Sequence, residues 1–259
     1  MRRLLAILSL MTFPFLASAQ YAGERDADEV YKYSKFEGKQ LIAPAVLTGA
    51  GLAIHYFAHE SLDYAVRDRF QEWSGGEDNF DWDDHLQYAP LAMDLGLGLV
   101  GAPAKNSFVD RAIESAIAHL FLGITSASAK HVFHTLRPNE RNWESFPSGH
   151  CDFVFANAEL TRMEYGWGWG GLAYGMAATV GTCRMYRNWH WFSDVIAGAG
   201  LGILSARVGG WLLEPVKDFF GVPETTWGSG KKKHKAQAAL VPAVDPFNGS
   251  YYASFALRF

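Results

Sequence analysis

The chain has 259 residues, enough for one sizeable domain with its own hydrophobic core. Hydrophobic residues make up 49% and aromatic residues 15% of the sequence, which excludes a disordered chain and predicts a packed body. A mean hydropathy of -0.05 is low for a protein built only of membrane spans, so each span has to be argued from its own segment.

The N-terminus carries the pattern of an export signal. Arg2 and Arg3 precede the apolar run 4–16, and Ala17-Ser18-Ala19 form a small-residue cleavage site. We therefore expect a signal peptide over residues 1–19 and an exported protein. Without the two arginines the chain has 21 Lys and Arg against 27 Asp and Glu, so its net charge is about -6. No basic stripe is present, which argues against a nucleic-acid partner.

A polar N-terminal arm over residues 20–40 precedes the predicted helical domain, residues 41–220. A charged linker over 221–235 and a β-hairpin over 236–259 follow, because the last ten residues alternate between large apolar and smaller residues. The Gly198-x-x-x-Gly202 spacing allows helices to approach closely, as in membrane bundles. The apolar helical stretches of the domain are 41–57, 88–104, 112–129, 150–163, 166–183 and 195–213.

Three short segments carry groups suited to phosphate chemistry. They are Lys130-x6-Arg137-Pro138, Pro147-Ser148-Gly149-His150 and Arg184-x5-His190-x3-Asp194. Phosphoryl transfer depends on positioning and on charge stabilisation, which Lys130, Arg137 and Arg184 can supply. Ser148 and the Gly149 N–H lie where a helix begins, and a helix N-terminus favours anions.

The two histidines of these segments suit different roles. His190 and Asp194 are four residues apart, so on a helix their side chains share a face. A carboxylate orients an imidazole and stabilises its cationic form, which makes His190 the expected nucleophile. His150 is then the expected general acid toward the leaving group. The loop 139–146 joins two of the motifs and is expected to border the pocket.

The three segments resemble the signature of the type 2 phosphatidic acid phosphatase (PAP2) superfamily, K-x6-RP, PSGH and SR-x5-H-x3-D. This resemblance implies an all-α PAP2-type helical bundle and a phosphohistidine intermediate. It also implies no metal and no cofactor, with the phosphate among Lys130, Arg137, Ser148, Gly149 and Arg184. The family serine before the arginine is Cys183 here, and Cys151 follows the PSGH histidine. Because both cysteines flank the same site, a Cys151–Cys183 disulfide is a hypothesis; two buried thiols are the alternative.

The short gap between Pro138 and Pro147 resembles the membrane lipid phosphatase branch, since soluble class A acid phosphatases usually place a longer insert there. Residues 146–166 and 181–213 also resemble exported lipid A 4'-phosphatase-like proteins of Bacteroidetes. The resemblance implies a membrane lipid phosphate as substrate, with lipid A, undecaprenyl diphosphate and phosphatidylglycerol phosphate as candidates. A soluble periplasmic class A-type acid phosphatase and a vanadium-dependent haloperoxidase are the alternatives. The sequence does not fix the oligomeric state.

The side of the membrane is the remaining question. With the signal removed, Gln20 lies outside the cytoplasm, and three spans at 41–57, 88–104 and 112–129 would place Lys130 inside it. We expect an active site that faces the periplasm, in the inner rather than the outer membrane, with the Asp94 segment as the weakest span.

Overall fold

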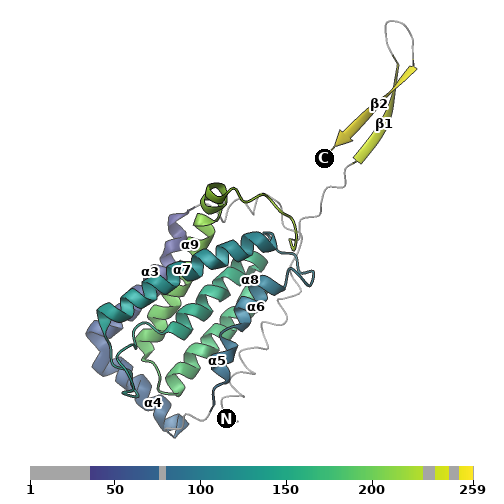
Figure 1. Ribbon diagram of the computed structural model, residues 1–259. Helices are drawn as coiled ribbons and strands as arrows, with labels where there is room; N and C mark the ends of the chain where they lie inside the picture. The colour runs from purple at the N-terminus through teal and green to yellow at the C-terminus, as the bar shows by residue number, and fades with distance from the viewer. Residues whose placement is uncertain (1–35, 76–79, 230–236, 245–250, 259) are drawn as a thin grey trace.

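A computed structural model of the chain describes residues 36–75, 80–229, 237–244 and 251–258 (Figure 1). The predicted signal peptide, residues 20–35 of the predicted arm and residues 230–235 of the predicted linker lie outside this part of the chain.

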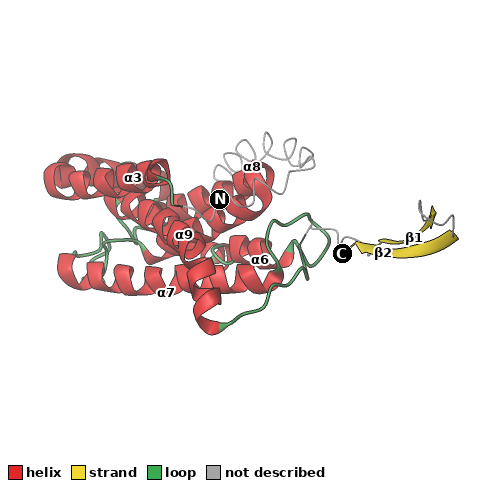
Figure 2. Cartoon of the chain, turned by 90° about the horizontal axis from the view of Figure 1, so that it is seen from above, coloured by secondary structure: helices red, strands yellow, loops and turns green. Residues whose placement is uncertain are grey.

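The body of the protein is helical, which confirms the predicted all-α class for it (Figures 1 and 2). A continuous helical segment runs from Gly38 to Ser74, and two short helices, α5 and α6, lead from it to three long helices. The elements are a 3-10 turn (Gly38–Leu41), α3 (Ile42–Ala53), a π-helical stretch (Ile54–Asp63), α4 (Tyr64–Ser74), α5 (Trp82–Leu86), α6 (Ala89–Gly96), α7 (Phe108–Phe133), α8 (Gly149–Tyr186) and α9 (Phe192–Phe220).

Helix α8 reverses direction at Gly166. This residue has φ 76° and ψ -169°, a conformation that essentially only glycine adopts without strain. The two halves of α8 pack against each other through small and branched apolar residues, which include Val154 and Ala158 before the reversal and Ala173 and Ala177 after it. The second half therefore returns to the end of the bundle at which the first half began.

Helix α9 is central to the bundle and lies between α3 and α7 (Figure 2). Its glycines lie against the backbone of three neighbouring helices, where a larger residue would not fit. A Cβ added to Gly200 would lie 2.5 Å from Thr48 N of α3, and a Cβ added to Gly209 would lie 2.6 Å from Glu114 O of α7. A Cβ on Gly202 would lie 2.2 Å from the Asp152 carbonyl oxygen of α8. The Gly198 and Gly202 spacing thus serves the close approach that the sequence predicts.

The helices bring all three sequence motifs to one end of the bundle, which we call the motif end. Lys130 lies there in the last turn of α7, α8 begins and ends there, and α9 begins there. At the opposite end, Lys217 of α9 pairs with Asp110 of α7 at 2.9 Å, and Trp211 of α9 donates to Gln40 at 2.7 Å. Gly38 and Phe220 therefore lie at the opposite end, and the segment 38–63 runs toward the motif end, where Asp63 contacts Ser193.

Within the described part of the chain, three helical segments are long and apolar enough to cross a membrane. They are Gly38–Ser74, Phe108–Phe133 and Phe192–Phe220. Their outward faces carry exposed large side chains such as Val46, Phe57 and Leu120, which suit a lipid environment. The predicted stretch 88–104 is not among these three, and within it only α6 is helical.

Beyond residue 236 the chain has two antiparallel strands, β1 (Gln237–Val244) and β2 (Tyr251–Arg258) (Figure 1). Gln237 pairs with Arg258 and Val244 with Tyr251. The side chains of these strands lie outside the described part of the protein. Whether residues 236–259 form a hairpin with a packed face therefore stays a prediction.

Candidate active site

The three sequence motifs are joined by hydrogen bonds at the motif end. Each motif contributes one residue that bonds to the backbone of another motif, so that the loops before α8 and α9 and the end of α7 hold one another in place. The bonds run from Lys130 Nζ to the Pro147 carbonyl oxygen (2.7 Å), from Ser148 N–H to the Asp194 carbonyl oxygen (3.1 Å) and from Trp191 Nε1–H to the Leu136 carbonyl oxygen (2.8 Å).

His190 is buried at the centre of this arrangement, with 4% of its surface exposed. Its Nδ1 lies 2.9 Å from the carbonyl oxygen of Ser145 and 3.4 Å from Oδ2 of Asp194. Both partners accept hydrogen bonds, so Nδ1 carries the proton and Nε2 carries the lone pair. A neutral imidazole held in this tautomer is suited to attack through Nε2.

Asp194 reaches His190 by a different route from the one that the sequence predicts. Helix α9 begins at Phe192, so His190 precedes it and the two residues do not share a helical face. Instead, Oδ2 of Asp194 folds back and accepts hydrogen bonds from Trp191 N–H at 2.8 Å and Ser145 Oγ–H at 2.5 Å. Ser145 therefore touches both His190 and Asp194. The sequence places it only within the loop expected to border the pocket.

Two of the predicted phosphate-binding groups are buried without a good partner. Among the described residues, neither Arg137 Nε nor Ser148 Oγ makes a well-formed hydrogen bond, although the weakly bonding Cys151 thiol lies beside Ser148. The Arg137 guanidinium lies over the Trp189 ring, 5.2 Å from its centroid. A Cβ at Gly149 would meet only the Lys130 side chain, at 3.9 Å, which leaves the helix N-terminus open to an anion. Donors of this kind suit phosphate oxygens.

Arg184, the third predicted phosphate-binding cation, is already paired. Its Nε and Nη2 donate to Oδ2 of Asp83, with the Nε bond at 2.7 Å, and its Nη2 also lies 2.8 Å from Oδ1 of Asp84. Both carboxylates come from α5, and Asp83 is fully buried. The sequence places Asp83 and Asp84 only within an acidic stretch, because runs of acidic residues are usually solvated.

His150, the predicted general acid, lies at the start of α8 and is about one third exposed. Its Nε2 lies 2.9 Å from Oδ1 of Asp84. Burial and then Arg184 lower the pKa of His150 to about 4, while Asp84 and Asp83 act in the opposite direction. The imidazole is therefore neutral near pH 7 unless a second anion comes close to it.

The proposed disulfide between Cys151 and Cys183 is wrong for this structure, because both residues are free, buried thiols. Cys151 faces Gly181 and Gly198, whereas Cys183 packs with Tyr186 in an aromatic cluster. The two thiols lie near enough to interact electrostatically, but they are not bonded. Burial raises the pKa of both thiols to about 12, so they stay protonated.

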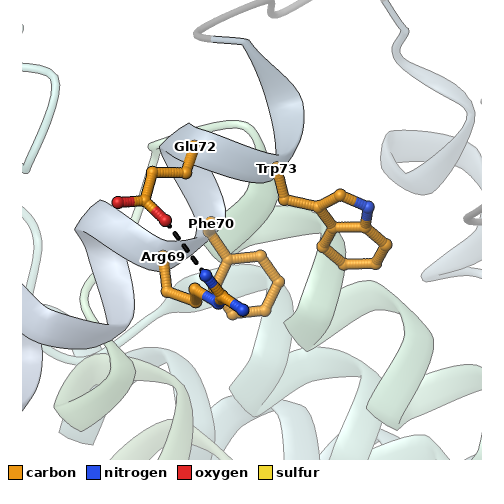
Figure 3. A pocket seen from close by; sticks show the side chains of 4 residues that line it. All are labelled: Arg69, Phe70, Glu72 and Trp73. Carbon is orange, nitrogen blue, oxygen red and sulfur yellow. Dashed lines mark hydrogen bonds and ion pairs between the residues drawn. The ribbon is translucent and has the colours of Figure 1, made fainter.

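Cavities lie at two places on the described part of the bundle surface. One of about 340 Å³ lies between α7 and α8 and reaches the site at Lys130 and Gly149. A larger one of about 640 Å³ is lined by Arg69, Phe70, Glu72 and Trp73 of α4 (Figure 3). Arg69 and Glu72 pair across its edge at 3.1 Å, and none of the predicted site residues lines it. Within the described residues, no group of three or more His, Cys, Asp or Glu is placed to hold a metal ion.

Known proteins match the segment that carries these motifs. Residues 113–216 match the model of the PAP2 superfamily. The lipid A 1-phosphatase of Porphyromonas gingivalis is 34% identical over 134 residues, which are 50% of this chain and 30% of that protein. The chain thus spans about 30% of the length of this relative. A similar solved structure is the crystal structure of Aquifex aeolicus LpxE, with TM-score 0.44, 19% identity, and coverage of 55% of this chain and 92% of that one.

Proposed function

Residues 113–216 form a PAP2 superfamily domain, as the three motifs predict, and from this premise we propose that the protein is a phosphatase acting on a membrane lipid. The substrate is a phosphate monoester or diphosphate, with lipid A and undecaprenyl diphosphate as the foremost candidates. The reaction passes through a phosphohistidine at His190. The observation that carries this proposal is the pair of acceptors at Nδ1 of His190, while Nε2 makes no hydrogen bond to any of the described residues.

The site residues account for both halves of the reaction. Nε2 of His190 attacks phosphorus, the bond from phosphorus to the leaving oxygen breaks, and His150 gives its proton to that oxygen. Water then attacks the phosphohistidine, His150 takes the proton from this water, and inorganic phosphate leaves as His190 is restored. Lys130, Arg137, Ser148 and the Gly149 N–H hold the phosphoryl oxygens, on which negative charge gathers.

Burial of His190 predicts the acid limb of the pH profile. Burial lowers its pKa to about 4, an effect that Asp194 opposes. A protonated imidazole has no lone pair at Nε2, so the contribution of His190 to kcat/KM is present above this pKa and is lost as the pH falls through about 4. Steady-state phosphate release between pH 3 and pH 8 measures this limb, and a return to pH 7 must restore activity. An acid limb near 6.5, the ordinary value for histidine, would contradict the burial argument.

A lipid substrate is supported by two observations. Three helical segments are long and apolar enough to cross a membrane, and the cavity at Lys130 and Gly149 opens between α7, one of these segments, and α8. The relative from Porphyromonas gingivalis is named for lipid A and for its 1-position. Lipid A carrying a phosphate at the 1- or the 4'-position is therefore the first substrate to test.

We also propose that the motif end faces the periplasm. Gly38 and Phe220 lie at the opposite end, and the sequence places Lys231, Lys232, Lys233 and Lys235 soon after α9. Lysine-rich segments next to a span favour the cytoplasmic side, which supports an external motif end in the inner membrane. In a spanning bundle, a cleaved signal peptide would instead place Gly38 outside. Arg141 is an exposed position of the loop before α8. The accessibility of the cysteine in an Arg141→Cys variant, measured from each side of the membrane, distinguishes the two orientations.

Phosphate release by the purified protein in detergent tests the activity. We expect release from lipid A or undecaprenyl diphosphate to exceed that from a soluble sugar phosphate, and mass spectrometry then identifies the phosphate position that is lost. A preference for soluble monoesters would favour a class A-type acid phosphatase. Bromide oxidation with vanadate, without release from any phosphate ester, would favour a haloperoxidase and overturn the proposal.

A further inference from the structure

The carboxylate of Asp84 lies between two residues of the site. Its Oδ1 is 2.9 Å from His150 Nε2 and 2.8 Å from Arg184 Nη2. Asp84 comes from α5, more than sixty residues before the PSGH motif, and none of the three sequence motifs includes it. The contact therefore joins the predicted general acid to a part of the chain that the family signature leaves out.

The position of Asp84 is fixed from several sides. Its Oδ2 accepts a hydrogen bond from Arg187 Nη1 at 3.2 Å, and the same Nη1 donates to Oδ1 of its neighbour Asp83 at 2.8 Å. Although burial raises the pKa of Asp84, Arg184 and Arg187 hold it below the ordinary value, so the carboxylate is charged at neutral pH. A charged, doubly held acceptor gives His150 a defined orientation.

We propose that Asp84 is a positioning residue, which holds the His150 imidazole through Nε2 so that its other ring nitrogen faces the leaving group. This role rests on the proposed phosphatase activity, because it needs His150 to act as the general acid. The arrangement parallels the one at His190, where Asp194 and the Ser145 carbonyl oxygen hold one nitrogen and leave the other free. Each histidine of the site would thus have its own carboxylate.

The charges around His150 explain why such a residue is needed. A general acid must be protonated when the leaving oxygen departs, yet burial and Arg184 both disfavour the imidazolium. Asp84 and Asp83 of α5 oppose these effects, and Arg187 lies on the far side of the two carboxylates. Removing the charge of Asp84 lowers the pKa of His150 further, so the protonated form is lost at a lower pH.

The test compares Asp84→Asn with wild type on two substrates in the full-length protein. The 4'-phosphate of lipid A, an alkyl phosphate and the lipid used here, needs a proton on its leaving oxygen, whereas an aryl phosphate such as p-nitrophenyl phosphate loses its leaving group readily without one. We expect kcat on the lipid to fall about 10- to 100-fold, less than most of the roughly 10²- to 10⁴-fold contribution of general acid catalysis because His150 itself is retained, and kcat on the aryl phosphate to fall far less. The alkaline limb of kcat on the lipid should move to lower pH.

Two further variants control the experiment. Asp81→Asn makes the same charge change at an exposed position of the same segment and should leave both activities unchanged. Asp84→Glu restores the charge and should recover part of the lipid activity, which shows that folding alone does not explain the loss.

Three results would overturn the role. The first is an equal loss of kcat on both substrates, and the second is no loss of kcat on either. The third is a lower KM with unchanged kcat and stronger inhibition by inorganic phosphate, which would make Asp84 a competitor of the substrate for Arg184. The proposed phosphatase activity fails separately, if the wild-type protein releases no phosphate.

Discussion

Replacement of His190 by alanine is expected to reduce phosphate release by at least about 10³-fold, the scale seen when a catalytic nucleophile is removed. The physical reason is that His190 carries the proposed attacking nitrogen, whereas the other histidine of the site, His150, is held by Asp84 and serves as the proposed general acid. Phosphate release in the steady state measures the loss. A brief incubation with ³²P-labelled substrate, followed by alkaline quenching, should label the wild-type chain and leave the variant unlabelled, since a phosphohistidine survives base and is lost in acid.

A matched control is available on α7. His131 is exposed and lies next to Lys130 in the sequence, but it takes no part in the proposed reaction. His131→Ala should keep the wild-type rate and labelling. If His190→Ala kept full activity with an unchanged melting temperature, another group would be the nucleophile and the proposed mechanism would be wrong.

Replacement of Gly202 by alanine is expected to destabilise the bundle by about 1–3 kcal/mol, the usual cost of overpacking a close contact. The new Cβ would lie 2.2 Å from the Asp152 carbonyl oxygen and 2.8 Å from Ala156 N. Both atoms belong to the backbone of α8, so neither can turn aside as a flexible side chain could. Thermal unfolding of the purified protein in detergent measures the effect as a lower Tm.

Gly175→Ala is the control for this substitution. Gly175 is also a helical glycine, in the second half of α8, but a Cβ there would meet no atom within 4 Å. Because alanine stabilises a helix relative to glycine by about 0.5–1 kcal/mol, this variant should unfold at the wild-type temperature or slightly above it. Equal destabilisation by both variants would show that helix contact is not the cause.

The sequence predicts the helices and the three motifs well because both depend on local patterns. Apolar stretches mark α7 and α9. The predicted starts at 112 and 195 lie four and three residues after the observed ones, and the predicted ends at 129 and 213 lie four and seven residues before the observed ends. The reversal inside α8 is not predictable in the same way. Glycine at position 166 permits a positive φ, but only the packing of residues 173–180 against the first half shows that the chain turns back there.

The surroundings of the site depend on contacts between distant segments, which local patterns do not reveal. The predicted helical face shared by His190 and Asp194 is absent, since a loop residue and a helix N-terminus bring the two together instead. Asp83 and Asp84 look like solvated charges in an acidic stretch, and only the fold of α5 onto α8 pairs them with Arg184. Cys151 and Cys183 lie near the same motifs in sequence but face different neighbours.

The backbone contacts of α9 on three sides limit how this protein can move. Rotation or sliding of α9 would bring its glycines into steric conflict with the main chains of α3, α7 and α8 at once. The helix that carries Asp194 is therefore expected to stay fixed within the bundle. Room for the proposed substrate therefore has to come from segments outside this contact, such as α5, which is tied to the end of α8 by ion pairs of Asp83 and Asp84. Motions that admit substrate should be sought in α5, for instance by hydrogen exchange with and without a phosphate analogue.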